Sequence, residues 1–242
     1  MVSDDNRIKN EIEHGAKIKE NAEGVWNWKS PAGKIRWQRR VRLLTAHLNP
    51  NMHVLEIGCG TGLLTQELQY SEADINAIDI SPDLLSIAKK KITSKNIKFT
   101  LENAYDLSFK DESFDTVIGS SILHHLNINK ALSEFYRVLK PGGTICFTEP
   151  NMLNPIIAVQ KNIPFIKKIM GDTPDETAFI KWKIKDQLRV YKYKNIEVTA
   201  FDFLHPSLPG FSLPIMIPFT DFLDKTPFIS EIAGSLYIKC QK

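Results

Sequence analysis

The chain has 242 residues, of which 43% are hydrophobic and 10% aromatic, and its 31 basic and 28 acidic side chains give a net charge of +3. This composition indicates a folded globular protein, excludes an intrinsically disordered one, and gives little support to nucleic-acid binding. No apolar run is long enough to cross a membrane, and the charged N-terminus lacks the apolar stretch of a secretory signal. Three well-separated cysteines argue against a disulfide framework, so we expect a protein of the reducing cytoplasm.

Residues 1–48 predict two helices, at about 7–23 and 34–48, separated by a Ser-Pro step. We expect this segment to form an N-terminal helical cap. Residues 29–42 hold six cations and no acid, interleaved with tryptophan. This stretch is typical of a solvated helix face, and an anion-binding or membrane-surface patch is the functional alternative.

Short apolar runs alternate with helical patterns between residues 49 and 150, which predicts a parallel sheet with helices on both faces. Ser81 is the expected N-cap of the helix that Pro82 begins. The predicted strands are residues 53–57, 75–80, 97–101, 116–120 and 144–149, and the predicted helices are residues 63–70, 82–92 and 128–139.

Residues 151–242 predict a helix at about 175–191 and two strands, 196–203 and 235–240, paired antiparallel at a sheet edge. Between these strands lies an apolar insertion, residues 203–234, whose first part contains four prolines and no charge. Residues 155–170 mix apolar side chains with lysines, as interfacial helices do. The insertion is either a loop packed over the active site or part of an apolar substrate channel or membrane contact.

The sequence VLEIGCGTG, residues 54–62, lies at a strand-to-helix turn, where glycines allow the backbone to approach a ligand closely. Asp79 ends the next strand, the position from which a carboxylate binds ribose hydroxyls. A dinucleotide fingerprint needs a small residue five positions after the first glycine, and this chain has Leu63 there. A nicotinamide dehydrogenase is therefore the less favoured alternative.

Four motifs in this order resemble those of the class I S-adenosylmethionine-dependent methyltransferases, in the small-molecule group with a methyltransferase type 11 domain. They are VLEIGCGTG, INAIDIS, NAYDLSFKDESFDTVIGSSILHHL and EFYRVLKPGGTICFTEPN, within residues 53–150. The resemblance implies a doubly wound α/β fold with a Rossmann-like, mostly parallel seven-stranded sheet of order 3-2-1-4-5-7-6. The methyltransferase domain would span residues 49–242, with the cofactor-binding core at 49–150 and substrate-side elements at 151–242.

The resemblance also implies S-adenosyl-L-methionine as the cofactor and S-adenosyl-L-homocysteine as the product. Asn103 stands where the family usually has Asp, and its amide can still both accept and donate hydrogen bonds. The residues expected to contact the cofactor are Glu56, Gly58, Cys59, Gly60, Gly62, Asp79, Ile80, Asn103, Ala104 and Ser120, with Trp28 and Arg36 from the N-terminal segment.

His124 and His125 follow the fourth strand, where a ligand crevice opens in parallel sheets, so either can serve as general base or simply fix the loop. Glu149 and His205 are weaker catalytic candidates. We expect no metal site, because adjacent histidines on a strand would point in opposite directions and no convergent carboxylates or cysteines are evident.

The expected function is methyl transfer to a small, hydrophobic or lipid-linked acceptor such as an isoprenoid, quinone-like or lipid-carried glycan molecule, with oxygen favoured as the methylated atom. The motifs that nucleic-acid methyltransferases carry after the fourth strand, Asn/Asp-Pro-Pro-aromatic or Pro-Cys, are absent. Two alternatives stay open: a cofactor-binding pseudoenzyme and a membrane-surface interaction module. The sequence leaves the oligomeric state undetermined, and a peripheral contact with the inner face of the membrane is an open possibility.

Overall fold

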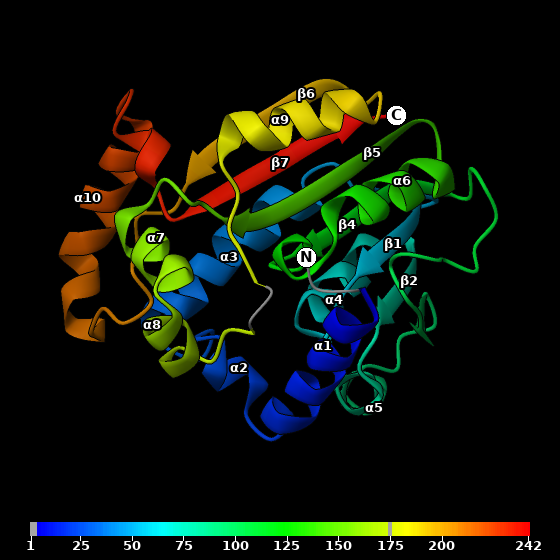
Figure 1. The fold of residues 1–242 in the computed structure, drawn as a ribbon, viewed down its shortest axis with the longest axis horizontal. Coiled ribbons are helices and arrows are strands. Elements are labelled where there is room, and N and C mark those ends of the chain that lie inside the picture. Colours follow the sequence, from blue (N-terminus) through cyan, green and yellow to red (C-terminus); the bar gives the residue numbers. More distant parts are fainter. Residues whose placement is uncertain (1–3, 174–175) are drawn as a thin grey trace.

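A seven-stranded sheet of order β3-β2-β1-β4-β5-β7-β6 forms the centre of the computed structural model, which describes residues 4–173 and 176–242 (Figure 1). Strands β1 to β5 are parallel, and β7 runs antiparallel to both of its neighbours, β5 and β6. This result confirms the expected fold class and strand order. The strands are β1 His53–Ile57, β2 Asp74–Asp79, β3 Ile97–Leu101, β4 Phe114–Ser120, β5 Leu139–Pro150, β6 Lys194–Phe201 and β7 Ser235–Gln241.

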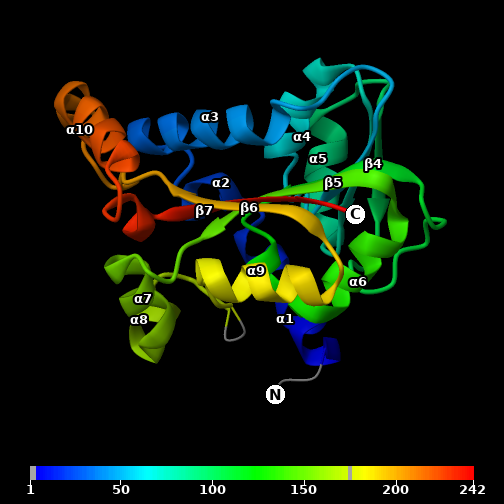
Figure 2. The ribbon, with the colours of Figure 1, turned by 90° about the horizontal axis from the view of Figure 1, so that it is seen from above.

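Helices cover both faces of the sheet: α3, α4 and α5 lie on one face, and α6 and α9 on the other (Figure 2). The central strands are buried on both sides, which explains their nearly continuous apolar sequences. The helices are α1 Asp4–Ile18, α2 Ala22–Val25, α3 Pro31–Thr45, α4 Leu63–Leu68, α5 Pro82–Lys91, α6 Ile128–Val138, α7 Pro155–Asn162, α8 Pro164–Ile169, α9 Lys181–Val190 and α10 Leu213–Lys225.

Helix starts follow from local side-chain chemistry. The Ser81 hydroxyl accepts a hydrogen bond from the Leu84 N–H at the start of α5, as expected for an N-cap followed by proline. Ser30 caps α3 in the same way through the Gly33 N–H, and Asn154 caps α7. These polar residues stabilise the first turns, whose N–H groups have no partner within the helix.

Several element boundaries differ from the sequence predictions. The first helix ends at Ile18 and a separate short helix, α2, follows. Strand β5 begins at Leu139, which pairs with Phe114 of β4, so its start lies five residues before the predicted residue 144. Helix α9 begins at Lys181, because Phe179 hydrogen-bonds to Pro150 in an extended bridge; the predicted start, Asp175, lies outside the described residues.

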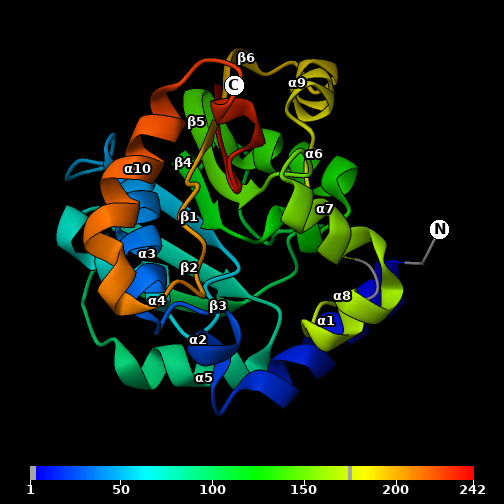
Figure 3. The same cartoon turned by 90° about the vertical axis from the view of Figure 1, so that its left-hand side faces the viewer.

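The apolar insertion contains a helix, α10, which the sequence did not predict because prolines usually interrupt helices. Pro214 occupies the first turn, where a missing N–H costs nothing, while Pro218 lies inside the helix. Helix α10 and the α7–α8 pair lie at the same end of the molecule (Figure 3). Among the described residues, no helix has both the length and the apolar character needed to cross a bilayer.

Helix α3 packs on the sheet, where Leu44 is fully buried and Trp37 and Val41 join the core cluster around β1, β2 and β4. Helices α1 and α2 lie instead over the carboxyl ends of the strands. The division of the chain into a cap of residues 1–48 and a domain of residues 49–242, like the bounds 203–234 of the insertion, stays a prediction.

Candidate active site

A cavity of about 540 Å³ lies at the carboxyl ends of β1, β2, β4 and β5, beneath α1 and α2. Its floor includes the glycine turn after β1, where Gly58 and Gly60 adopt positive φ angles of 66° and 53°. A side chain at either position would be strained, and at Gly58 it would collide with Ile122. The following helix, α4, directs its N-terminus toward this turn, which suits a polar or anionic ligand group.

Asp79 ends β2 at the edge of this cavity and is buried. Its two carboxylate oxygens accept hydrogen bonds from the backbone N–H groups of Gly60, at 2.7 Å, and Ser81, at 2.8 Å. Burial raises the pKa of Asp79, and the two N–H donors oppose that rise. Each oxygen keeps further acceptor capacity, so the fixed carboxylate can bind a pair of neighbouring hydroxyl groups.

Glu56 lies on β1 next to the glycine turn and is almost fully buried. The Thr65 hydroxyl donates a hydrogen bond to its carboxyl group at 2.7 Å. Burial is the main cause that raises the pKa of Glu56 to about 8, against the opposing Thr65 bond. A cationic group placed in the cavity would restore the ionised form.

A second, smaller cavity of about 60 Å³ lies beside the first, and the two share Asp79, Ile80 and Gly58 as lining residues. Asn103 and Ala104 line the smaller cavity, which Ile8 of α1 also borders. Apart from Asn103 and Ala104, all but two of the predicted positions line the main cavity. The main cavity is lined by Trp28, Arg36, Glu56, Gly58, Cys59, Gly60, Asp79, Ile80, Ser120, His124, His125 and His205.

Two predicted site residues do not line either cavity. A Cβ on Gly62 would meet Ile92 and Ala88 of the neighbouring helix, so the absence of a side chain there serves the packing of α4 against α5. Glu149 lies behind His124 and has no exposed surface. Its effect on a ligand must therefore pass through the residues it binds.

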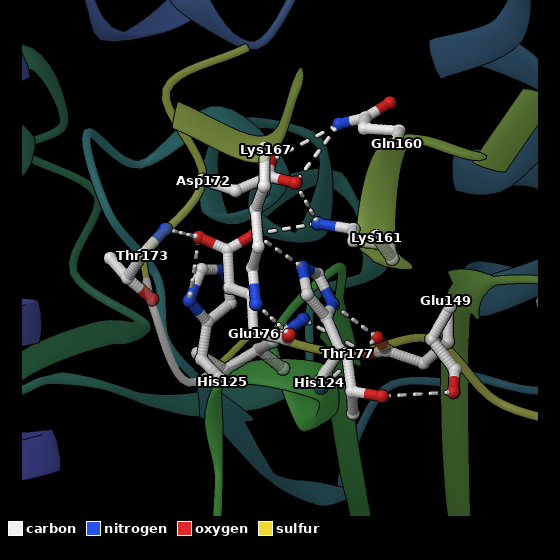
Figure 4. Close-up of polar contacts among 12 residues, drawn as sticks. His124, His125, Glu149, Gln160, Lys161, Lys167, Asp172, Thr173, Glu176 and Thr177 are labelled. Carbon is white, nitrogen blue, oxygen red and sulfur yellow. Dashed lines mark hydrogen bonds and ion pairs between the residues drawn. The ribbon is translucent and has the colours of Figure 1, made fainter. Parts of the chain in front are cut away.

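The His124 ring is held by Glu149. Its Nδ1 lies 2.7 Å from Glu149 Oε2, and the same carboxylate accepts backbone hydrogen bonds from Ile122 and Leu123 at 2.9 and 2.8 Å (Figure 4). Because a carboxylate only accepts, Nδ1 carries the proton, and Nε2 carries the lone pair of the neutral ring. Burial and the neighbouring charge of His125 lower the pKa of His124, although Glu149 opposes this change.

His125 has a different environment. Its Nδ1 lies 3.0 Å from Glu11 of α1 and 3.7 Å from Glu176. Burial alone would lower the pKa of His125, but the two carboxylates outweigh burial and raise it to about 9. The buried ammonium group of Lys161 lies 2.7 Å from Glu176 and 2.9 Å from Asp172. The pair is thus one neutral ring beside one charged ring.

The geometric reason for excluding a metal site is wrong. His124 and His125 lie on the one-turn 3-10 helix Leu123–His125, so their rings lie side by side with centroids 4.2 Å apart. One nitrogen of each ring and a carboxylate oxygen of Glu176 lie within 4.8 Å of one another, close enough to share a metal ion. The Lys161 ammonium already supplies positive charge to this carboxylate.

Comparison with known proteins identifies the family. A family model described as a methyltransferase domain matches residues 55–147. The demethylmenaquinone methyltransferase of Staphylococcus aureus is 34% identical over 188 residues, which cover 68% of this chain and 77% of that protein. The demethylmenaquinone methyltransferase of Symbiobacterium thermophilum is 29% identical over 210 residues, covering 82% of this chain and 77% of that protein. This chain belongs to the class I S-adenosylmethionine-dependent methyltransferases.

The fold agrees with this assignment. A crystal structure from Thermotoga maritima, described as an S-adenosylmethionine-dependent methyltransferase and possible histamine N-methyltransferase, matches with a TM-score of 0.67 and 19% identity. The match covers 95% of this chain and 99% of that one, and at this identity it concerns the fold alone. The chain is therefore an S-adenosylmethionine-dependent methyltransferase of the small-molecule type.

Trp28 and Arg36 of the methyltransferase lie on the side of the cavity nearest β6 and β7. The guanidinium groups of Arg36 and Arg40 lie over the Trp28 ring, with their Cζ atoms 5.6 and 5.0 Å from its centroid. His205 Nδ1 accepts a hydrogen bond from the Ser207 N–H at 3.2 Å, so its Nε2 carries the proton and acts as a donor. This tautomer makes His205 unsuited to act as a general base.

Three polar residues that the sequence did not single out complete the site. Glu11, Glu176 and Lys161 come from α1, a loop and α7, far from one another in the chain. No motif marks them, because only the folding of both flanking segments over the sheet brings them to the histidine pair. The sequence offers one signal for this set, a single lysine, Lys161, near the end of the mostly apolar α7.

Proposed function

We propose that the methyltransferase transfers the methyl group to a hydroxyl oxygen of a hydrophobic, quinone-like acceptor in its reduced, hydroxyl-bearing form, with His124 as the general base. The observation that carries this proposal is the buried His124–Glu149 pair, in which the His124 ring lines the main cavity and Glu149 holds it from behind. A general base is needed when the acceptor atom is protonated at neutral pH, as a hydroxyl is.

The chemistry follows from the states of the two rings. S-adenosylmethionine supplies a methyl group that its sulfonium has already activated, so the protein mainly aligns the acceptor with it. As the oxygen–carbon bond forms and the sulfur–carbon bond breaks, the acceptor hydroxyl gives its proton to His124 Nε2. Glu149 then stabilises the charged ring through the hydrogen bond to Nδ1. The lowered pKa keeps His124 neutral and ready to accept this proton.

The cofactor fits the residues around the glycine turn. We assign the ribose hydroxyls to Asp79, whose orientation the Gly60 and Ser81 N–H groups fix. The adenine would enter the smaller cavity, between Ile80 and the Asn103–Ala104 backbone. Glu56, Cys59 and Ser120 remain for the methionine portion along the main cavity. Trp28 and Arg36, also expected at the cofactor, line the β6–β7 side of the cavity beyond this portion.

The acceptor class rests on the walls and surroundings of the cavity. Apolar side chains of Ile156, Ile157 and Met170 line the wall formed by α7 and α8, and Leu204 lines the opposite side. Both relatives described above are named for demethylmenaquinone. Exposed apolar side chains on α10 and on α7–α8 surround the same end of the molecule, which supports a peripheral membrane contact through which such an acceptor enters.

The test is transfer of labelled methyl from S-adenosylmethionine to a bacterial lipid extract, with the methylated atom identified in the purified product. We expect an O-methylated lipid, and a rate loss of about 10²- to 10⁴-fold in His124→Gln, because a general base contributes that much. His53→Gln is the matched control, since His53 lies at the start of β1, at the amino ends of the parallel strands, and lines neither cavity.

Three other outcomes would contradict parts of this proposal. Full activity of His124→Gln would exclude its role as a base, and a C- or N-methylated product would exclude oxygen as the acceptor atom. Cofactor binding with no transfer to any extract, together with binding to liposomes, would favour the cofactor-binding or interaction-module alternatives.

A further inference from the structure

Three arginines of α3 gather around a single buried carboxylate, Asp202, which directly follows β6. Arg36 Nε and Arg40 Nη1 both donate to Asp202 Oδ2, each at 2.9 Å, and Arg39 Nη1 donates to Oδ1 at 3.1 Å. Arg39 also pairs with Asp221 and does not line the main cavity. On the cavity side, therefore, two guanidinium groups share one carboxylate.

These two guanidinium groups have unused donors. Arg40 is buried, and its Nε has no hydrogen-bond partner, although Nη2 donates to the Ser235 hydroxyl. The two Nη atoms of Arg36 have no partner among the described residues, and this side chain lines the cavity. The His205 ring also lines the cavity and carries its proton on Nε2. Burial lowers the pKa of His205, and the nearby charge of Arg36 lowers it further. The free Nη donors of Arg36 and the His205 N–H thus collect at one wall of the cavity without a matching acceptor, whereas the unpaired Arg40 Nε is enclosed and adds only the positive charge of its guanidinium.

This donor wall lies on the acceptor side of the sheet. Arg40 is held by Asp202 after β6 and Ser235 of β7, whereas the glycine turn follows β1 and Asp79 ends β2. Strands β4 and β5 lie between β1 and β7 in the sheet. In methyl transfer the acceptor approaches the methyl group from the side opposite to the sulfur. The cofactor assignment leaves the β7–β6 side of His124 free, so we place the acceptor there.

We propose that Arg36, Arg40 and His205 form a subsite for an oxyanion on an aromatic acceptor, such as a phenolate or carboxylate next to the methylated position. The Trp28 ring lies against both guanidinium groups and gives this wall of the cavity a flat aromatic surface beside its charges. A guanidinium binds a carboxylate or phenolate through short, charge-assisted hydrogen bonds, and a neutral amide of the same shape lacks that gain. The placement of the acceptor here rests on the proposed function.

The test is calorimetric titration of 2-naphthoate and its neutral isostere 2-naphthamide into the full-length protein saturated with S-adenosylhomocysteine. We expect naphthoate to bind at least tenfold more tightly than naphthamide. Arg36→Gln should weaken naphthoate binding at least tenfold and leave naphthamide binding unchanged. Arg39→Gln is the matched control, because it also loses a bond to Asp202 but lies outside the cavity, and it should change naphthoate affinity less than twofold.

Equal losses in Arg36→Gln and Arg39→Gln, or no preference for naphthoate over naphthamide, would overturn the subsite. Titration of each variant with S-adenosylhomocysteine separates the two sources of a carboxylate. If Arg36→Gln weakens S-adenosylhomocysteine binding and leaves naphthoate binding intact, the arginines serve the cofactor and the proposal is wrong. Binding of naphthoate needs no turnover, so failure of the subsite and failure of the proposed methyl transfer give different results.

Discussion

Glu11 Oε2 lies 3.0 Å from His125 Nδ1, and this ion pair joins the N-terminal helix α1 to the turn after β4. Arg7, one turn earlier on α1, donates a second bond to the backbone carbonyl of His125 at 3.0 Å. Because α1 lies over both cavities, these two contacts hold a cover above the assigned cofactor site. Movement of α1 would therefore open both cavities further to solvent.

This cover is expected to loosen at alkaline pH. The pKa of His125 in the folded protein is raised to about 9, above the usual 6.5, so its stabilising contribution is complete below pH 6.5 and is lost as the pH rises through about 9. Hydrogen-exchange protection factors of α1 amides should fall between pH 7 and 9.5. Glu11→Gln should lower protection about tenfold at pH 7, because the buried charge of His125 loses its ion-pair partner, and should reduce the pH dependence.

Glu13→Gln is the control for this experiment, because Glu13 lies on the exposed side of α1 and pairs only at 4.0 Å with Lys9. It should leave α1 protection unchanged. Equal protection of α1 in the Glu11 and Glu13 variants would show that the ion pair does not hold the cover.

Replacement of Asp79 should weaken cofactor binding. Loss of the charge-assisted bonds to the ribose hydroxyls should cost roughly 1.5 to 3 kcal/mol in Asp79→Ala, measured by titration with S-adenosylhomocysteine. Alanine also leaves the buried N–H groups of Gly60 and Ser81 without their acceptor. Asp79→Asn keeps one acceptor oxygen and separates the two effects, and unchanged affinity in both variants would refute the assignment.

A side chain at Gly60 should block the site. A Cβ there would lie 3.1 Å from the Trp26 ring, and the backbone has a φ angle of 53°, so Gly60→Val should raise the dissociation constant for S-adenosylhomocysteine at least tenfold. Gly142→Ala is the control, since Gly142 has a φ angle of 79° but open space around its Cβ position. Both variants bear about 1–2 kcal/mol of backbone strain, and only the first faces the ligand. Tight binding by a folded Gly60→Val would contradict the proposed cofactor site.

Glu56 should make the ligand-free protein less stable as the pH rises. Its pKa in the folded state is raised to about 8, against 4.5 for the unfolded chain, so the folded protein holds an extra proton between these values. Its contribution is complete below pH 4.5 and declines by at most about 1.4 kcal/mol per pH unit up to pH 8. Urea unfolding from pH 5.5 to 8.5 should show a steeper decline for the wild type than for Glu56→Gln. Parallel curves would mean that Glu56 is ionised in the folded protein.

The cofactor half of the site was readable from the sequence because it depends on short-range chemistry. Glycines at a strand-to-helix turn and an acid at the next strand end determine a local backbone shape, and the structure places Gly58, Gly60 and Asp79 around one cavity. The same pattern also predicts a ligand contact for Gly62, whose missing side chain serves the packing of α4 against α5. Motif spacing cannot distinguish these two uses of a missing side chain.

The acceptor half could not be predicted because it is assembled from distant segments. The expectation that His124 and His125 diverge assumed a strand, whereas Glu149 accepts the N–H groups of residues 122 and 123 and so stabilises a tight turn. Similarly, the partners of Arg36 and His125 lie 166 and 114 positions away along the chain. Contacts of that range depend on tertiary packing and leave no local periodicity.

The exposed apolar surface of α10 and of the residues before it should bind to membranes. Phe211 and Ile215 are 86% and 77% exposed, and Phe219 and Phe222 extend the same apolar surface. A large apolar side chain removed from water contributes about 1.5–3 kcal/mol, so the double variant Phe211→Asp, Ile215→Asp should reduce sedimentation with liposomes of anionic lipids at least tenfold. Tyr70→Asp, at a side chain that is 75% exposed on another element, is the control and should sediment like the wild type. If both variants sediment equally with liposomes, the apolar surface of α10 does not contact lipid.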